Sequence, residues 1–514
     1  MKSLTIIIPY STQENILEEL IISAWQLDPI EIIILLHSSK SGLYTIAKKH
    51  KCRIFFEDRY IGNHSGYVAA LKAARGDVLL FLDGNFSVLT AQIREFLEPI
   101  LINQTDVILN NLNGIIDVEK CHNLDVVWRK MLNEILHRPD LKGNSLLSMP
   151  YALTKEVVVG IGYEVLKKPI FSHTMLVDQG WRISHRYSIN MLSNDELLQE
   201  AGYLFKEKLS DAEKLKIKNY LVVLSKWLKK YGTRGGFTDW GKRRDIIEQL
   251  SQYKHFPSYQ KGWGMKSSIY DGKQLSVIIP AQNEEATIEQ VIREARKIEP
   301  YEILVVVNGS DDQTGAIASN LGATVIEYAE RLGHNVGRAI GALEATGDIL
   351  LFVDGDFSIP ASDLHRYTQA VADGMDIALN NLNPSLNPPF YIVDIVKYML
   401  NLAYNRSELS NGSLVAIPHA ISRSCIEGIG WESLLCPSLA QVKAIIQGYR
   451  VECIHYVDVV KPNRIRSNEH INQKGHPPAV LRIMGDHIEA LSYLIKHLDL
   501  HDDLDMKEQG EIKI

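Results

Sequence analysis

Residues 347–358 read GDILLFVDGDFS, and this stretch decides the fold. Its apolar run, residues 349–353, is short and bounded by turn-forming residues, a pattern typical of a strand buried on both faces of a parallel sheet. Asp354 and Asp356 follow directly on a tight turn. Because Asp-Gly is among the commonest turn pairs, the tripeptide alone does not establish a functional site.

The same stretch occurs twice in the chain. Residues 76–87 read GDVLLFLDGNFS, and the separation of this pair equals that between residues 2–9 (KSLTIIIP) and 273–280 (KQLSVIIP). Two further pairs keep the same order and nearly the same separation: 106–113 with 376–383, and 160–164 with 428–432. Repeats that stay in register over this length indicate one duplicated domain. The period is far too long for a solenoid.

Each copy alternates predicted strands with predicted helices. Continuous apolar runs such as 31–36 (EIIILL) and 302–307 (EILVVV) are typical of buried parallel strands. The segments between them, such as 286–298 and 337–345, have the spacing of amphipathic helices. This alternation predicts an α/β fold with two tandem domains, each a doubly wound, mainly parallel sheet.

The repeats also predict domain boundaries. We assign residues 1–193 to the first domain and residues 273–514 to the second. The intervening residues 194–272 are charged and helix-rich, and we expect them to extend the first copy and then form a linker. The linker is placed near residues 256–272, where Gly, Ser and Pro are frequent.

Composition excludes several classes of protein. The 55 Lys+Arg against 62 Asp+Glu give a net charge of −7, which disfavours nucleic acid as a partner. The 46% hydrophobic and 23% charged residues are ordinary for globular domains. The 5 cysteines contain no C-x-x-C pair, which favours a reducing compartment. No apolar run is long enough to cross a bilayer. We expect a cytoplasmic protein, and association with a membrane surface stays open.

Polar residues follow three predicted strands of the second copy. They are residues 280–285 (PAQNEE), 308–314 (NGSDDQT) and 354–356 (DGD). In open α/β sheets, ligands bind beyond the carboxyl ends of the strands, where these segments would meet. Two carboxylates one residue apart suit a hard cation such as Mg²⁺ or Mn²⁺. Such a cation can bridge a diphosphate and offset the charge on it as a leaving group.

These motifs, together with residues 337–348 (GRAIGALEATGD), resemble those of the family 2 glycosyltransferases with the GT-A fold. The resemblance covers both copies at the level of fold and the second copy at the level of motifs. It implies a nucleoside diphosphate sugar as donor and Mn²⁺ or Mg²⁺ as cofactor. It assigns the metal to Asp354 and Asp356, and the nucleotide sugar to Pro280, Asn283, Glu284, Asn308, Asp312 and Asp354.

The second copy departs from the family pattern at two places. Residues 307–310 read VNGS where the family usually has DDGS, so an amide replaces a base-binding carboxylate. The acidic pair that supplies the base of inverting members is missing, and residues 436–441 (CPSLAQ) stand there. Glu432 is the nearest candidate base, with Glu427 second, although a structural hydrogen bond would equally explain Glu432. The missing pair also leaves room for a retaining enzyme, similar to glucosyl- or mannosyl-glycerate synthases.

Two further site residues come from the end of the second copy. His455 follows a strand-like run, at the place where many GT-A enzymes have a third metal ligand; a core histidine is the alternative. Arg464 lies in a basic loop, residues 461–466, that could close on a diphosphate; a solvated loop is the alternative.

The first copy has lost much of the motif set. Asn85 replaces the second acid of the turn, and residues 36–40 (LHSSK) and 10–14 (YSTQE) depart from the nucleotide-binding loops. We expect a degenerate copy that supports the second or holds an acceptor or sugar. The Asn-rich segments 110–113 and 380–383 are kept in both copies, as turns or as contacts to sugar hydroxyls.

The sequence therefore predicts a metal-dependent glycosyltransferase that moves a hexose to an unidentified acceptor, with the second copy catalytic. The acceptor is left as a small molecule, a lipid carrier or a glycan. Two alternatives stay open. A sugar-1-phosphate nucleotidyltransferase would need a Gly-rich loop after the first strand, which residues 280–284 lack. A non-catalytic binding scaffold would not need the two acids Asp354 and Asp356.

Overall fold

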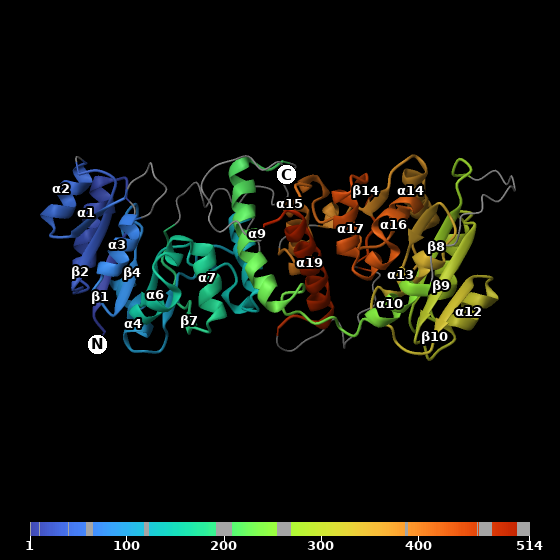
Figure 1. Cartoon of the computed structure of the whole chain (residues 1–514), viewed down its shortest axis with the longest axis horizontal. Helices are drawn as coiled ribbons and strands as arrows, with labels where there is room; N and C mark the ends of the chain where they lie inside the picture. The colour runs from blue at the N-terminus through green and yellow to red at the C-terminus, as the bar shows by residue number, and fades with distance from the viewer. Residues whose placement is uncertain are drawn as a thin grey trace. The chain divides into compact units, whose positions relative to one another are not determined.

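The computed structural model describes residues 2–9, 11–39, 41–57, 65–117, 123–191, 208–253, 269–385, 389–459, 461 and 475–500. These residues divide into two units (Figure 1). The first holds the described residues up to 191 together with 215–223. The second holds residues 208–214 and the described residues from 224 to 500.

The first unit is built on a seven-stranded sheet in the order β3-β2-β1-β4-β6-β5-β7. Strand β6 pairs antiparallel with β4 and β5, and the other pairings are parallel. Its strands are β1 (Leu4–Ile8), β2 (Glu31–Leu36), β3 (Arg53–Phe56), β4 (Val78–Phe81), β5 (Val107–Leu109), β6 (Tyr151–Thr154) and β7 (Ile183–Ser184).

The second unit repeats this topology in the order β10-β9-β8-β11-β13-β12-β14, again with one antiparallel strand, β13. Its strands are β8 (Leu275–Ala281), β9 (Glu302–Asn308), β10 (Thr324–Tyr328), β11 (Ile349–Phe352), β12 (Ile377–Asn380), β13 (His419–Ser422) and β14 (Val451–His455). The duplicated, mainly parallel α/β fold predicted from the sequence is confirmed.

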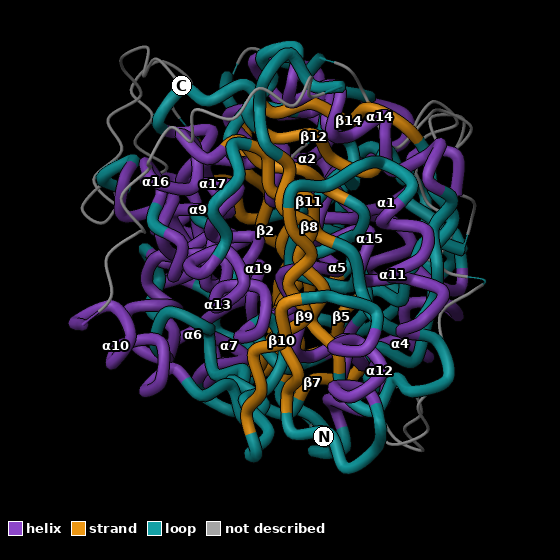
Figure 2. Tube along the Cα trace, turned by 90° about the vertical axis from the view of Figure 1, so that its right-hand side faces the viewer, coloured by secondary structure: helices purple, strands orange, loops and turns teal. Residues whose placement is uncertain are grey.

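Helices cover both faces of the strands (Figure 2). In the first unit they are α1 (Glu14–Trp25), α2 (Gly42–Lys49), α3 (Ser65–Ala73), α4 (Thr90–Leu101), α5 (Leu124–Ile135), α6 (Lys155–Ile161) and α7 (Pro169–Asp178). In the second they are α11 (Ile288–Arg296), α12 (Thr314–Asn320), α13 (Val336–Glu344), α14 (Ala361–Ala372), α15 (Ile392–Ala403), α16 (Arg423–Ile429), α17 (Pro437–Ile446) and α19 (Pro478–His497). Helices α9 (Asp211–Tyr231) and α10 (Arg244–Tyr253) lie between the copies in sequence.

The central strands are buried because both of their faces carry apolar side chains. All four residues of β11 are buried, and β11 pairs with β8 through Ile349↔Leu275 and Phe352↔Ile278. Helix α13 lies close to this sheet at a glycine: a Cβ on Gly341 would stand 2.4 Å from Ile278 Cγ2. The absence of a side chain at Gly341 therefore allows α13 to pack closely against β8.

The segment between the two copies packs mainly with the second unit, not with the first as expected from the sequence. Residues 224–253 belong to the second unit, whereas we expected them to extend the first copy. Lys242 Nζ lies 2.5 Å from Asp486 Oδ1 on α19, and Arg234 NH1 lies 2.8 Å from the same oxygen. Pairing between residues so far apart in sequence leaves no local pattern that could have shown it. Most of the predicted linker, residues 254–268, lies outside the described residues.

Candidate active site

A cavity of about 100 Å³ lies at the carboxyl ends of β8, β9 and β11, in the second unit. Residues from these strand ends meet the first turn of α13 and the loop before it. The cavity is lined by Pro280, Ala281, Gln282, Glu284, Asn308, Gly333, His334, Asn335, Gly337, Arg338, Asp354, Gly355 and Asp356. Five of the predicted site residues, Pro280, Glu284, Asn308, Asp354 and Asp356, are thus brought together.

The turn 354–356 is anchored from the neighbouring loop. Thr287 Oγ1 donates to the carbonyl oxygen of Gly355 at 2.7 Å. A Cβ on Gly355 would lie 3.1 Å from Ala281 Cβ, so this close approach favours glycine. Asp354 and Asp356 stand on either side of the anchored glycine and line one cavity. Two half-buried carboxylates in this position fit a hard divalent cation.

Arg338 is the main site residue that the sequence analysis missed. It is the third residue of α13, its side chain is only 4% exposed, and NH2 donates to Asp354 Oδ1 at 2.9 Å. A buried guanidinium therefore lies directly beside the acidic turn and offers positive charge to an anionic ligand. An arginine within an otherwise apolar helix, residues 336–343, was the signal available in the sequence.

His419 lies behind this pair and stays neutral. Burial, with Arg338 nearby, lowers the pKa of His419 to about 3. Its Nδ1 donates to the carbonyl of Ala416 at 2.8 Å, and its ring stacks on Phe352 at 5.0 Å between centroids. Of Arg338 and His419, only Arg338 therefore contributes positive charge beside the acidic turn.

Asn308 explains why an amide replaces the family's carboxylate. Its Oδ1 accepts from the N–H of Leu332 at 2.5 Å, and its Nδ2 donates to the carbonyl of Gly333 at 3.1 Å. A carboxylate could accept the first bond but has no N–H for the second. Asn308 thus fixes the loop that forms one wall of the cavity.

Asn283 and Asp312 hold two loops together instead of lining the cavity. Asn283 has a left-handed backbone (φ 56°), and its Oδ1 accepts from the N–H of Asp311 at 2.8 Å. Asp312 accepts from Thr314 and from the N–H of Glu285. Burial raises the pKa of Asp312, but these hydrogen bonds outweigh it and the net shift is downward. Asn283 and Asp312, both predicted to bind the nucleotide, therefore hold together the two loops beside the cavity.

The other predicted residues lie apart from the cavity lining. His455 Nε2 is 3.1 Å from Asp363 Oδ1 on α14, and Glu432 is exposed at the 3-10 helix Trp431–Leu435. Glu427, the second candidate base, is exposed and 3.9 Å from Arg423. Arg464 lies outside the described residues. The roles assigned to these four residues stay predictions.

The first unit carries a different arrangement at the equivalent turn. Asn85 Nδ2 donates to Asp83 Oδ1 at 2.9 Å, and Asn85 Oδ1 accepts from the N–H of Thr12 at 2.8 Å. Tyr67 stands at the position of Arg338, and Tyr151 at that of His419. This turn therefore lacks one acid, and Tyr67 replaces the buried cation.

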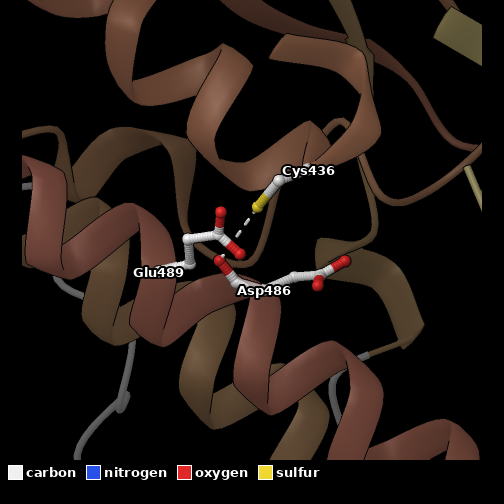
Figure 3. Close-up of side chains that lie close together, drawn as sticks. All are labelled: Cys436, Asp486 and Glu489. Carbon is white, nitrogen blue, oxygen red and sulfur yellow. Dashed lines mark hydrogen bonds between the residues drawn. The ribbon is translucent and has the colours of Figure 1, made fainter. Parts of the chain in front are cut away.

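A second group of metal-ligand type lies in the second unit, where α19 meets Cys436, the residue before α17. Ligand atoms of Cys436, Asp486 and Glu489 lie within 4.8 Å of one another (Figure 3). Both carboxylates are already bound by cations: Arg234 NH1 lies 2.7 Å from Glu489, and Arg244 NH1 2.9 Å from its other oxygen. We therefore interpret this group, with Arg234, Lys242 and Arg244, as an ion-pair cluster and call it the α19 cluster.

The paired acids, the buried arginine and the fixed loop lie at the ends of parallel strands of an α/β domain, and their chemistry suits a polar, anionic ligand. The chain belongs to glycosyl transferase family 2, whose sequence model matches residues 5–152 and 276–408. The two matched regions fall on the two copies, so both units are GT-A-like domains arranged in tandem.

Individual relatives match a short part of the chain. Undecaprenyl-phosphate 4-deoxy-4-formamido-L-arabinose transferase of Pectobacterium atrosepticum is 30% identical over 120 residues, covering 21% of this chain and 37% of the relative. Glucosyl-3-phosphoglycerate synthase of Mycobacterium tuberculosis is 34% identical over 119 residues, covering 20% of this chain and 35% of the relative. The match therefore spans little more than a third of these relatives.

Among solved structures, the same mycobacterial synthase in complex with Mn²⁺, uridine diphosphate and glucosyl-3-phosphoglycerate is similar to this chain. The similarity has 21% identity and a TM-score of 0.30, and covers 40% of this chain and 78% of that one. Within the described residues of the present chain, no helix combines the length and apolar character needed to span a bilayer.

Proposed function

We propose that the second unit transfers a hexose from a nucleoside diphosphate sugar to an oxygen atom of an acceptor. The observation that carries this proposal is the cavity in which Asp354 and Asp356 lie beside the buried Arg338. Family membership supports the class of reaction. The first unit has lost the acid and the arginine of this arrangement, and we propose that it does not catalyse transfer.

Asp354 and Asp356 would hold Mn²⁺ or Mg²⁺. A cation bound there would act as a Lewis acid and offset charge on the departing diphosphate. Arg338 keeps Asp354 in place through its 2.9 Å bond and adds a fixed positive charge. Asn308 holds the wall at Leu332 and Gly333, while Pro280 and Glu284 border the cavity. These residues bind and orient the donor.

The acceptor is proposed by chemical class only. The names of both relatives contain a phosphate-bearing molecule, undecaprenyl phosphate in one and phosphoglycerate in the other. We therefore propose to test phosphorylated small molecules and lipid phosphates as acceptors before unphosphorylated glycans. A cytoplasmic location is also part of the proposal. It agrees with the cysteines, which contain no C-x-x-C pair.

Substitution of Glu432 distinguishes an inverting reaction from a retaining one. An inverting reaction needs a base to activate the acceptor, and Glu432 would supply it after the acceptor binds. A retaining reaction does not need that carboxylate. Glu432→Gln should lower turnover by at least a hundredfold in the first case and leave it nearly unchanged in the second.

Donor binding provides the direct test. We would measure thermal shifts of the full chain with a panel of nucleoside diphosphate sugars, with and without Mn²⁺, because ligands that bind the native state raise its melting temperature. Asp356→Asn should remove the Mn²⁺-dependent shift. The control is Asp83→Asn, the same change at the one acid of the equivalent turn in the first unit, which should keep the shift. An unchanged shift in Asp356→Asn would refute the metal assignment.

A further inference from the structure

The first unit has a cavity larger than the candidate active site of the second unit, although its nucleotide motifs are degenerate. This cavity has a volume of about 210 Å³ and lies beyond the carboxyl ends of β4 and β5. Its walls come from the turn at Asp83, the first turns of α5, residues 147–149 before β6, and Met191. All of these residues belong to the first unit, so the cavity is a feature of that unit alone.

Arg129 and Ser148 supply a cation and a hydroxyl group in the wall of this cavity. The Arg129 side chain is only 11% exposed, and its two amino nitrogens donate to Asp125 and to Ser148 Oγ. Its Nε is buried, and no described residue accepts a hydrogen bond from it. Nε is closed off from the cavity, and the Tyr220 hydroxyl lies beside this guanidinium. Ser148, which accepts from Arg129, lines the cavity and has its own O–H to donate to a ligand oxygen.

Asp83 supplies a hydrogen-bond acceptor in the wall of this cavity. Its Oδ1 receives two hydrogen bonds from Asn85, both at 2.9 Å. Among the described residues none donates to its Oδ2. One carboxylate oxygen is therefore left for a hydroxyl group. The rest of the wall is mixed: Asn110, Asn123 and Asp125 add polar groups, and apolar side chains come from Phe86, Leu112, Val126, Leu147, Met149 and Met191.

The charge of the cavity selects among ligands. Two carboxylates, Asp83 and Asp125, face one guanidinium, Arg129, so the charged groups in the wall carry a net negative charge. That balance opposes a diphosphate. The amide of Asn85 also occupies the hydrogen-bonding position that a metal-bound carboxylate would need. A carboxylate acceptor, a hydroxyl donor and an aromatic ring in a wall of mixed polarity instead match the hydroxyl groups and C–H faces of a sugar.

We propose that this cavity binds a neutral saccharide about the size of a hexose, without a metal ion. The first unit is then a carbohydrate-binding domain made from a degenerate transferase copy. The binding is independent of the proposed reaction in the second unit, so either can fail without the other.

The experiment measures binding of methyl glycosides to the full chain by saturation-transfer NMR, with EDTA present throughout. The probes are the methyl α- and β-glycosides of glucose, galactose and mannose, with glycerol as a non-sugar control. We expect at least one glycoside to bind in EDTA. Asp83→Asn and Arg129→Met should each weaken that binding at least tenfold. Arg138→Met, which removes another ion-paired arginine of this unit, should not.

Two outcomes would overturn the proposal. The first is that no glycoside binds to the wild-type chain in EDTA. The second is that binding is lost in Asp354→Asn and kept in Asp83→Asn, which would place the sugar in the second unit. If Arg129→Met fails to fold, Ser148→Ala and Phe86→Leu test the same wall, and full binding in both together with full binding in Asp83→Asn would also refute it.

Discussion

The side-chain amide of Asn85 donates a hydrogen bond to Asp83 Oδ1 at 2.9 Å, in the turn where the second copy has the two acids Asp354 and Asp356. The amide oxygen of Asn85 accepts from both the N–H and the hydroxyl of Thr12 at 2.8 Å. One substitution thus converts a turn suited to a cation into a turn held by hydrogen bonds. The change at Tyr67, in place of Arg338, removes positive charge from the same strand end.

Alanine at the first acid of each turn tests the asymmetry of the copies. Asp354→Ala should lower donor hydrolysis by orders of magnitude, because each 1.4 kcal/mol of lost transition-state stabilisation costs about tenfold. Asp83→Ala should leave metal-dependent donor hydrolysis within a few-fold of wild type. Both variants would be assayed side by side at saturating Mn²⁺. Equal, severe losses would show two working sites.

Arg338 should matter for donor binding. Arg338→Met removes the cation beside Asp354, and we expect the affinity for a nucleoside diphosphate sugar to fall at least tenfold, which is about 1.4 kcal/mol. Arg338→Lys should recover part of it, because an ammonium keeps the charge but not the planar geometry. Calorimetric titration would measure both. Tyr67→Phe, at the equivalent position of the first copy, is the control and should bind normally.

Asn85→Asp should destabilise the first unit above about pH 4. Two carboxylates would then face each other where Asn85 Nδ2 and Asp83 Oδ1 are now 2.9 Å apart. Like charges raise the pKa of one carboxyl above its unfolded value of about 3.9, so the destabilisation is present above that pH and disappears below it. Melting temperatures at pH 7 and pH 4 would show this. Mn²⁺ should raise the melting temperature of the Asn85→Asp first unit more than that of the wild-type first unit. An equal increase in both would contradict the claim that the hydrogen-bonded turn excludes a metal ion.

The α19 cluster should contribute strongly to the stability of the second unit. Lys242 has a fully buried side chain and lies 2.5 Å from Asp486. Lys242→Met leaves that carboxylate with less compensation, and removing one partner of a buried ion pair costs about 3–5 kcal/mol. Arg243→Met is the matched control, because Arg243 is 39% exposed and its ion pairs should contribute little. Urea denaturation followed by circular dichroism would compare them, and equal losses would contradict the prediction.

The same variant tests whether the segment before the second copy supports the cavity. Arg243 donates its backbone N–H to Leu332 at 2.8 Å, and a Cβ on Gly333 would collide with Gly241 O at 2.6 Å. Lys242→Met should therefore weaken donor binding as well as stability. Unchanged donor affinity in a folded Lys242→Met protein would limit the segment to a role in stability.

Stability should fall as the solution is acidified from pH 6.5. Burial is the main cause that lowers the pKa of His173 and His419 to about 3 and of His487 to about 4. The unfolded chain binds protons on these groups near pH 6.5 while the native chain does not, so their contribution is present above that pH and is lost toward pH 4. The melting temperature should therefore decrease over this range. His487→Gln should flatten the decrease, and an unchanged slope would exclude this histidine as a cause.

Much of the architecture could be predicted because its signals are local. Apolar runs such as 349–353 identify strands, and residues after a parallel strand must lie at the carboxyl edge of the sheet. Asp354, Asp356, Asn308, Pro280 and Glu284 were found in this way. Arg338 was missed because helical spacing marks residue 338 as buried, and spacing does not distinguish a buried cation from a core side chain.

The sequence by itself determined the duplication, the α/β class of both copies and the strand ends at which ligands would bind, since each of these follows from short-range periodicity and from repeated motifs. Only the tertiary structure decided which distant residues meet. It paired Arg338 with Asp354, bound Asn308 to Leu332, attached Lys242 to Asp486 across 244 positions, and placed Arg129 in the first-unit cavity with Asp83. Ion pairs and cavities depend on the packing of whole elements, and a charged residue carries no local mark of its distant partner.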